Sequence, residues 1–249
     1  MYIPKLVFQI WIGRDENIPE YYTVSKNSIE KYMVSCGWKY IFLKTEDVVA
    51  FIRQEYPEHL AMYLGFEHDI QRADAARPLV LEKYGGLYLD MHFELTENID
   101  RLFITKAGYD VFLLPSPNFP AYYTNAFMAS LPGADLWKNY LDEMKKEVPW
   151  YALGKHLVVM HSTGPLALNR ALEKSRSVVK KIKNELVAPC SVCDIGEDVA
   201  PTPGRLVRQM RGGTWHQWDS KMYDFLMCNW KELLVGILFV YVIYCAREP

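Results

Sequence analysis

The chain has 249 residues, of which 50% are hydrophobic and 14% aromatic, so it is long enough to bury the core of one large domain. Its formal net charge is −2, which argues against a nucleic-acid-binding protein, because such proteins usually carry a basic excess. We therefore expect no nucleic-acid partner.

The N-terminal part alternates between strand and helix patterns. The apolar run Leu6–Trp11 predicts a buried strand, and a helix is expected over residues 20–36. A second strand is predicted over Trp38–Leu43, and a helix capped by Thr45 follows it to about Gln54. This order of elements is typical of an α/β layer architecture.

The next predicted helix, Phe66–Lys83, carries apolar residues along one face and is expected to kink or restart at Pro78. Gly85 and Gly86 end it, because glycine readily adopts the left-handed conformation that a helix end needs. A short central strand then ends at Asp90.

The second half of the chain is predicted to contain a strand over Val111–Leu114, a surface helix over Asp135–Glu147 and a helix over Gly164–Lys174. The basic segment Ser175–Lys183 is expected to be a solvated surface. Residues 194–204 are rich in Gly and Pro and predict a loop.

Five cysteines are scattered along the chain: Cys36, Cys190, Cys193, Cys228 and Cys245. An odd, scattered set predicts no disulfide framework, and one CxxC motif (residues 190–193) cannot fill a tetrahedral zinc site unaided. We expect ordinary thiols in a reducing compartment, with a redox pair or half a zinc site as alternatives. The first residues also lack the pattern of a secretory signal, which favours a cytoplasmic location.

The C-terminal run Leu233–Ala246 is uncharged and strongly apolar. A membrane-spanning helix needs about 20 apolar residues, and extending this run back to Phe225 brings in Lys231 and Glu232. The sequence thus leaves open a membrane anchor over 225–246 or a buried strand or helix. We divide the chain into a domain over residues 1–224 and an apolar segment over 225–249. An anchor, in the Golgi or endoplasmic reticulum membrane for example, would leave the domain facing the cytosol.

Asp90 and His92 are two positions apart, so on a strand their side chains share one face. A carboxylate and an imidazole together suit Mn²⁺ better than Mg²⁺. The alternative is an aspartate that caps a turn beside a surface histidine.

Arg72, Asp74 and Arg77 precede this pair on one predicted helix, where Asp74 and Arg77 are neighbours. A carboxylate paired with a guanidinium can hold sugar hydroxyls while the cation faces a phosphate. The alternative is an ordinary helical salt bridge. A short connection from helix to strand would bring the pair and Asp90 into one cleft.

The segment from Arg72 to Asp90 resembles the signature of the DXD-containing glycosyltransferases. That group includes the yeast initiating α-1,6-mannosyltransferase, the inositol-phosphoceramide mannosyltransferases and the glucosylating clostridial toxins. Shorter segments at Gln9–Gly13, Asn125–Ala129, Thr163–Pro165 and Gly213–Trp215 also resemble the family, so the likeness covers about residues 3–220.

The resemblance implies an α/β, GT-A-type nucleotide-diphospho-sugar transferase fold, with a mixed central sheet flanked by helices. It also implies a nucleotide-sugar donor, a divalent metal and retention of anomeric configuration. Trp11 would stack on the donor base, Trp215 would contact the diphosphate, and core packing is the alternative for both. Carried over by position, the catalytic residues are Asp74, Arg77 and Asp90, and the substrate-binding residues are Trp11, Arg72, Gly86, Tyr88, Asn125 and Trp215.

One residue departs from the family pattern, which usually has Asp where this chain has His92. The expected metal ligands are therefore Asp90 and His92, with His216 as an additional ligand. The first hypothesis is an active transferase that moves a hexose, such as mannose, to a hydroxyl of a glycan or glycolipid. The second is an inactive relative that binds carbohydrate or nucleotide sugar. A dinucleotide-dependent enzyme is disfavoured, because no G-x-G-x-x-G motif follows the first strand.

Overall fold

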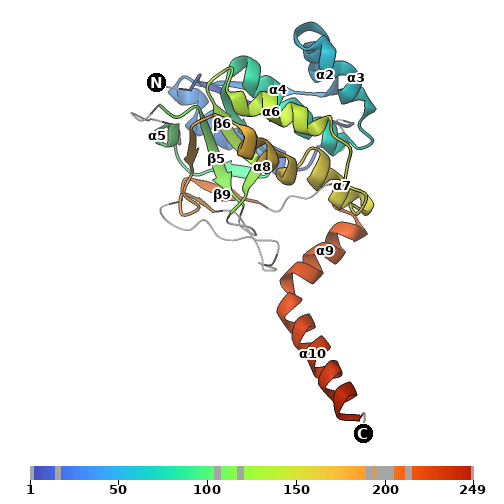
Figure 1. Ribbon diagram of the computed structural model, residues 1–249. Coiled ribbons are helices and arrows are strands. Elements are labelled where there is room, and N and C mark those ends of the chain that lie inside the picture. The colour runs from blue at the N-terminus through green and yellow to red at the C-terminus, as the bar shows by residue number, and fades with distance from the viewer. Residues whose placement is uncertain are drawn as a thin grey trace.

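The computed structural model describes residues 3–14, 18–103, 108–116, 121–188, 193, 205–210 and 215–247, with side chains in the last helix up to residue 239 (Figure 1). Its centre is a mixed six-stranded sheet with the strand order β2-β1-β3-β6-β5-β7. These strands are β1 (Leu6–Ile10), β2 (Lys39–Leu43), β3 (Gly86–Leu89), β5 (Val111–Pro115), β6 (Tyr123–Ser130) and β7 (Val179–Lys181).

Parallel pairing places β1 between β2 and β3, and β6 then runs antiparallel between β3 and β5. A second, small sheet pairs β9 with β4 and β8. Its strands are β4 (Phe93–Leu95), β8 (Val187–Ala188) and β9 (Val207–Gln209).

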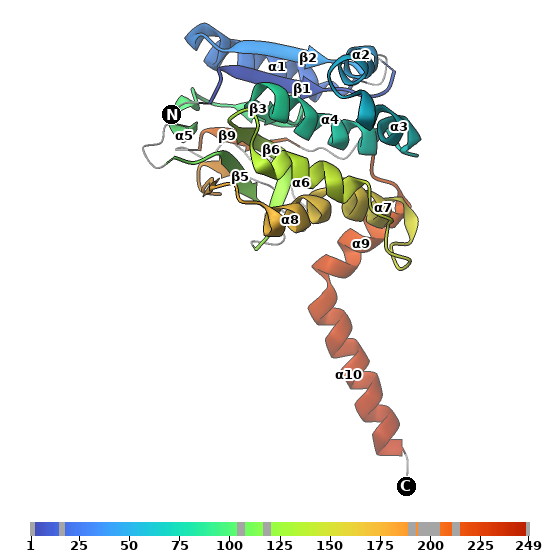
Figure 2. The same ribbon diagram turned by 45° about the horizontal axis from the view of Figure 1, so that its top comes forward.

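Helices and the small sheet cover both faces of the main sheet (Figure 2). One face packs against α2 (Thr45–Glu55), α3 (Pro57–Gly65), α4 (Asp69–Tyr84), α6 (Asp135–Met144) and α8 (Pro165–Lys174). The other packs against α1 (Tyr21–Tyr32), α5 (Asp100–Phe103) and the small sheet. A single-turn 3₁₀ helix, η2 (Val34–Cys36), follows α1, and α7 (Gly154–Ser162) precedes α8.

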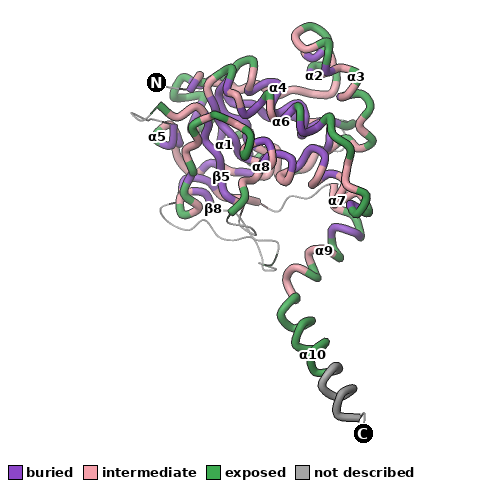
Figure 3. Tube along the Cα trace, viewed as in Figure 1, coloured by how far each residue is buried: buried purple, intermediate pink, exposed green. Residues whose placement is uncertain are grey.

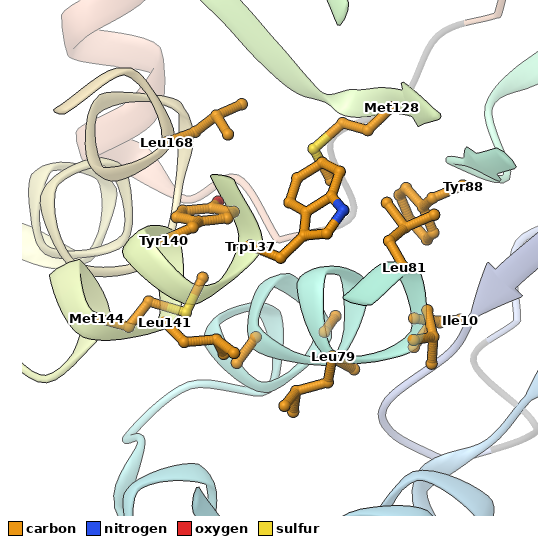
Figure 4. Packing of buried hydrophobic residues seen from close by; sticks show 14 of the residues in the cluster. Ile10, Leu79, Leu81, Tyr88, Met128, Trp137, Tyr140, Leu141, Met144 and Leu168 are labelled. Carbon is orange, nitrogen blue, oxygen red and sulfur yellow. The ribbon is translucent and has the colours of Figure 1, made fainter. Parts of the chain in front are cut away.

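Large side chains fill the core on the α4 face of the sheet (Figure 4). Trp137 of α6 is fully buried there, and its indole N–H donates to Ser130 Oγ of β6 over 2.8 Å. Because the polar atom of this large ring has a partner, the helix can bury it against the sheet without leaving a donor unsatisfied.

Two glycines connect α4 to β3 and need backbone conformations that favour glycine. Gly85 has φ +62° and Gly86 has φ +95°. A Cβ atom on Gly86 would lie 2.6 Å from the carbonyl oxygen of Leu6, so β1 and β3 can pair closely only because this side chain is absent. α4 continues as one helix through Pro78, so the expected restart there does not occur.

Two expectations from the sequence need correction, one about a segment and one about the cysteines. The basic segment Ser175–Lys183 is not only a solvated surface, because β7 forms within it and pairs with β5 at the edge of the sheet. Cys193 and Cys228 are disulfide-bonded with Cα atoms 5.3 Å apart, so the expectation of ordinary thiols is wrong for this pair. Cys190 and the predicted loop over 194–204 lie outside the described residues.

Helix α9 (Trp218–Cys228) begins against α7, and α10 (Trp230–Arg247) extends away from the body of the molecule (Figures 1 and 3). Residues 230–239 of α10 are all exposed, so the alternative of a buried strand or helix does not hold for them. In the described part of the chain, no helix combines the length and apolarity that crossing a membrane requires.

Candidate active site

A cleft of about 1080 Å³ opens beyond the carboxyl ends of β1 and β3, with Trp11 and Asp90 among its lining residues. These two strands are parallel neighbours, and the chain leaves β1 toward β2 on one side and returns to β3 on the other. Ligands of open α/β sheets bind at such a reversal of strand order. The fold therefore places the cleft where a nucleotide would be expected.

Arg77 of α4 joins two carboxylates beneath this cleft. Its guanidinium lies 3.0 Å from Asp74 Oδ1 and 3.1 Å from Asp90 Oδ1, and it donates to the carbonyl oxygen of Asn125 over 3.0 Å. It also stacks over the ring of Tyr88, 4.8 Å from its centroid. Burial alone would lower the pKa of Arg77, but Asp90, Tyr88 and Asp74 together raise it.

Asp74 lies behind Arg77 with only 2% of its surface exposed. Its Oδ1 accepts a hydrogen bond from Asn125 Nδ2 over 3.0 Å, and its Oδ2 accepts one from Thr163 Oγ1 over 3.1 Å. Burial raises the pKa of Asp74 to about 7, although Arg77 opposes this shift. One guanidinium faces two carboxylates, so ionising both leaves an uncompensated negative charge in a buried place.

Asp90 follows β3 and lines the cleft, and its two oxygens have different partners. Oδ1 accepts from the Tyr88 hydroxyl and faces Arg77, whereas Oδ2 lies 3.7 Å from His92 Nδ1. Burial raises the pKa of Tyr88, so its hydroxyl remains a donor at neutral pH. The donors around Oδ1 thus fix the direction in which Oδ2 points.

His92 is held between the cleft and the small sheet. Its backbone carbonyl accepts from Met210 N over 2.6 Å, and its Nε2 lies 3.3 Å from Gln209 Nε2. Burial lowers the pKa of His92 despite the neighbouring Asp90, so the ring is neutral at physiological pH, as a metal ligand must be. It is therefore not the surface histidine of the alternative interpretation.

The Asp90–His92 pair fits two ligands of one divalent cation. Ligand bonds of roughly 2.1 Å allow two donor atoms to be up to roughly 4.2 Å apart, and Oδ2 and Nδ1 are 3.7 Å apart. Within the described residues, no group of three or more His, Cys, Asp or Glu side chains comes together. Oxygen atoms of water or of a bound phosphate are suitable further ligands for such a cation.

The walls of the cleft carry Trp11, Arg72 and Trp215. The Trp11 indole donates to the carbonyl oxygen of Arg14 over 3.0 Å, and Arg72 donates to Asp69 Oδ1 over 2.7 Å. Trp215 stacks on His156 with ring centroids 5.5 Å apart. Both tryptophans are only partly buried, so neither belongs to the core.

Sequence-predicted site residues occupy two levels. Seven of them line the cleft: Trp11, Arg72, Arg77, Tyr88, Asp90, His92 and Trp215. Asp74 and Asn125 form the buried layer below, and Gly86 lies at the start of β3 against Leu6. His216 contacts the rings of His156 and Trp215, and its role as a metal ligand stays a prediction.

Four contributors were not predicted: Lys155, Tyr140, Thr163 and Gln209. Tyr140 of α6 lies within hydrogen-bonding distance of Asn125 and donates to the Thr163 carbonyl, so it fixes the layer below the cleft. The Thr163–Pro165 segment was the one available signal, because it matched the family pattern without indicating a role.

Residues 19–108 match the family model described as "Glycosyltransferase sugar-binding region containing DXD motif". The predicted resemblance to this family of glycosyltransferases is thus confirmed for these residues. The matched region contains α4, β3 and Asp90, which form the floor of the cleft.

Known proteins similar to this chain include inositol phosphoceramide mannosyltransferase 1 of Schizosaccharomyces pombe, 28% identical over 233 residues. That match covers 93% of this chain and 68% of the relative. The mannosyl phosphorylinositol ceramide synthase SUR1 of Saccharomyces cerevisiae is 30% identical over 168 residues, covering 67% of this chain and 41% of the relative. The chain thus spans less than half of this second protein.

Among solved structures, the UDP-bound glycosyltransferase domain of the YGT toxin is similar with a TM-score of 0.51 and 8% sequence identity. The likeness covers 73% of this chain and 80% of that one. At this identity it bears on the fold alone. The predicted α/β fold of the GT-A type, with a mixed sheet flanked by helices, is confirmed.

Proposed function

We propose that the protein transfers a hexose, with mannose as the first candidate, from a nucleotide-diphosphate sugar to a hydroxyl of a glycan or glycolipid. The observation that carries this proposal is the Asp90–His92 pair, supported from below by Arg77, on the floor of the cleft. The names of the similar proteins favour mannose and an inositol-phosphate-containing lipid acceptor.

In this proposal, Trp11 stacks on the donor base and the diphosphate lies over Asp90 and His92. Asp90 and His92 would hold a divalent cation, Mn²⁺ more readily than Mg²⁺, which would supply positive charge for the departing diphosphate. Arg77 and Tyr88 hold Asp90 Oδ1, so Oδ2 keeps its direction toward the cleft. The acceptor hydroxyl attacks the anomeric carbon from the face of the leaving group, its proton goes to the departing phosphate, and the configuration is retained.

The test is release of nucleoside diphosphate from a panel of nucleotide sugars, with Mn²⁺, Mg²⁺ or a chelator present. We expect turnover of one donor that is lost in Asp90→Asn, which keeps the size of the side chain, and altered metal preference in His92→Asp. Absence of turnover with any donor would overturn the proposal. Donor binding without turnover would instead support an inactive relative that binds nucleotide sugar.

We also propose that the C-terminal segment 225–246 associates with a membrane. Consecutive residues of α10 are exposed over more than two turns, so its apolar side chains point in all directions rather than along one stripe. A lipid environment covers every side of such a helix, whereas a protein groove covers one. Trp230 and Lys231 at its start suit the interface between lipid and water.

Flotation with vesicles of phosphatidylcholine and phosphatidylinositol tests this association. The full chain should float with the vesicles, and Leu234→Asp/Leu238→Asp should not. The matched control is Val34→Asp/Val178→Asp, which places the same charges at exposed apolar positions elsewhere and should leave flotation unchanged. Equal behaviour of the two variants, or no flotation of the unmodified chain, would refute the membrane role.

The disulfide between Cys193 and Cys228 indicates the compartment in which the protein works, since such bonds persist in oxidising environments. We propose that the domain works in an oxidising compartment, such as the lumen of the secretory pathway, rather than in the cytosol. Mass spectrometry of a non-reduced digest from native cells should find the peptides of Cys193 and Cys228 joined. Finding both thiols free would restore the cytosolic interpretation.

A further inference from the structure

We infer that Lys155, at the start of α7, binds the diphosphate of the donor. This inference rests on the proposed function and adds a residue that the sequence pattern did not single out. Lys155 lines the same cleft as Trp215, Asp90 and His92.

The charges of the cleft identify Lys155 as the available cation. Four basic residues line it: Arg14, Arg72, Arg77 and Lys155. Arg77 faces Asp74 and Asp90, Arg72 is paired with Asp69, and Arg14 also has an interaction partner. The side chain of Lys155 makes no hydrogen bond or ion pair with any residue that the structure describes.

The first turn of α7 is fixed in place by α9. Asp219 Oδ2 accepts from the backbone N–H of His156 over 2.7 Å, and Ser220 Oγ lies 3.1 Å from His156 Nδ1. The ring of His156 is stacked between Trp215 and Tyr223, at centroid distances of 5.5 and 5.3 Å. The residue next to Lys155 is therefore held through its backbone, its ring nitrogen and both faces of its ring.

Besides the divalent cation of the proposed function, a diphosphate in the cleft can use a positively charged side chain, which the floor does not supply. The floor holds two carboxylates for one guanidinium, so Arg77 offers no spare positive charge to an anion. A lysine side chain is a mobile point charge with three donors, which suits phosphate oxygens whose positions change as the leaving group departs. Lys155 can reach such oxygens from the wall while its backbone stays fixed.

The experiment is isothermal titration of the full chain with UDP, GDP and the corresponding nucleosides, in the presence of Mn²⁺. We expect Lys155→Ala to weaken binding of the preferred diphosphate roughly 10-fold or more and to leave nucleoside binding unchanged. Lys155→Arg should restore part of the affinity. Raising the salt concentration should also weaken diphosphate binding less in Lys155→Ala than in the unmodified protein.

Lys138→Ala is the matched control, because Lys138 is an exposed lysine on α6 that does not line the cleft. It should bind like the unmodified protein, and equal melting temperatures of the two alanine variants exclude unfolding as a cause. If the unmodified protein binds a diphosphate and Lys155→Ala binds it equally well, this inference fails alone. If the unmodified protein binds neither diphosphate, the inference and the proposed function fail together.

Discussion

Replacing Arg77 by methionine should destabilise the protein more than any single change at the surface. Arg77 is 4% exposed and is the cation between Asp74 and Asp90. Methionine keeps most of the apolar stem but leaves two carboxylates facing each other without a cation. Breaking a buried ion pair in this way costs about 3–5 kcal/mol, a large part of the 5–15 kcal/mol that typically stabilises a domain.

The penalty should depend on pH with a definite sign. In the native protein, burial raises the pKa of Asp74 to about 7, above its ordinary value of 3.8, so ionising Asp74 disfavours the folded state. Without Arg77 this pKa rises further. Below pH 7 the Asp74 carboxyl is protonated in the folded states of both the unmodified protein and Arg77→Met. As pH rises above 7, it ionises in the unmodified protein at a lower pH than in the variant. The difference in the free energy of unfolding contributed by Asp74 should therefore appear above pH 7 and grow as pH rises.

Guanidinium chloride denaturation at pH 6 and pH 8.5, followed by circular dichroism, measures this difference. The double variant Asp74→Asn/Arg77→Met should recover more than half of the loss at pH 8.5 and should lose the pH dependence. A penalty below about 1 kcal/mol at pH 8.5 would refute the assignment of a buried ion cluster. So would an equal penalty at both pH values.

Two further predictions concern stability. Burial alone would raise the pKa of Glu143, but hydrogen bonds from Lys146, Lys174 and Arg170 lower it to about 2. Glu143→Gln should therefore cost about 1–3 kcal/mol at pH 7, and the difference should disappear as pH falls from about 4.5 toward 2, because the stabilising charge is lost there. Gly86→Ala should cost roughly 3 kcal/mol or more, against about 1–2 kcal/mol for Gly37→Ala. Both have positive φ, but an added Cβ meets the Leu6 carbonyl only at Gly86, so equal losses in denaturation would refute the packing argument.

The parts of the site that the sequence could predict are local. The helix from Asp69 to Tyr84, the glycine turn and the short strand to Asp90 are contiguous, so periodicity and glycine chemistry indicate the elements that carry Arg77 and Asp90. The strands β1 and β2 were also predicted, because each is a run of residues with the pattern expected of a strand.

The parts that could not be predicted depend on contacts between distant residues. Thr163 reaches Asp74 across 89 positions, and Gln209 reaches His92 across 117. The small sheet that brings Gln209 there consists of strands of two or three residues, which are too short for a periodic signal. Cys193 and Cys228 likewise meet only because the fold brings their segments together.

The buried layer changes how the predicted sugar contacts should be understood. Both oxygens of Asp74 already accept hydrogen bonds from Asn125 and Thr163, and Arg77 already spans both carboxylates. Asp74 is only 2% exposed, so a donor sugar could reach it only by displacing one of the groups that cover it, and the lost hydrogen bond would cost about 1–3 kcal/mol. Asp90 and His92 line the cleft, so in the proposed function direct contact with the donor would fall to them. Asp74 would then act through Arg77, by fixing the direction in which Asp90 presents Oδ2.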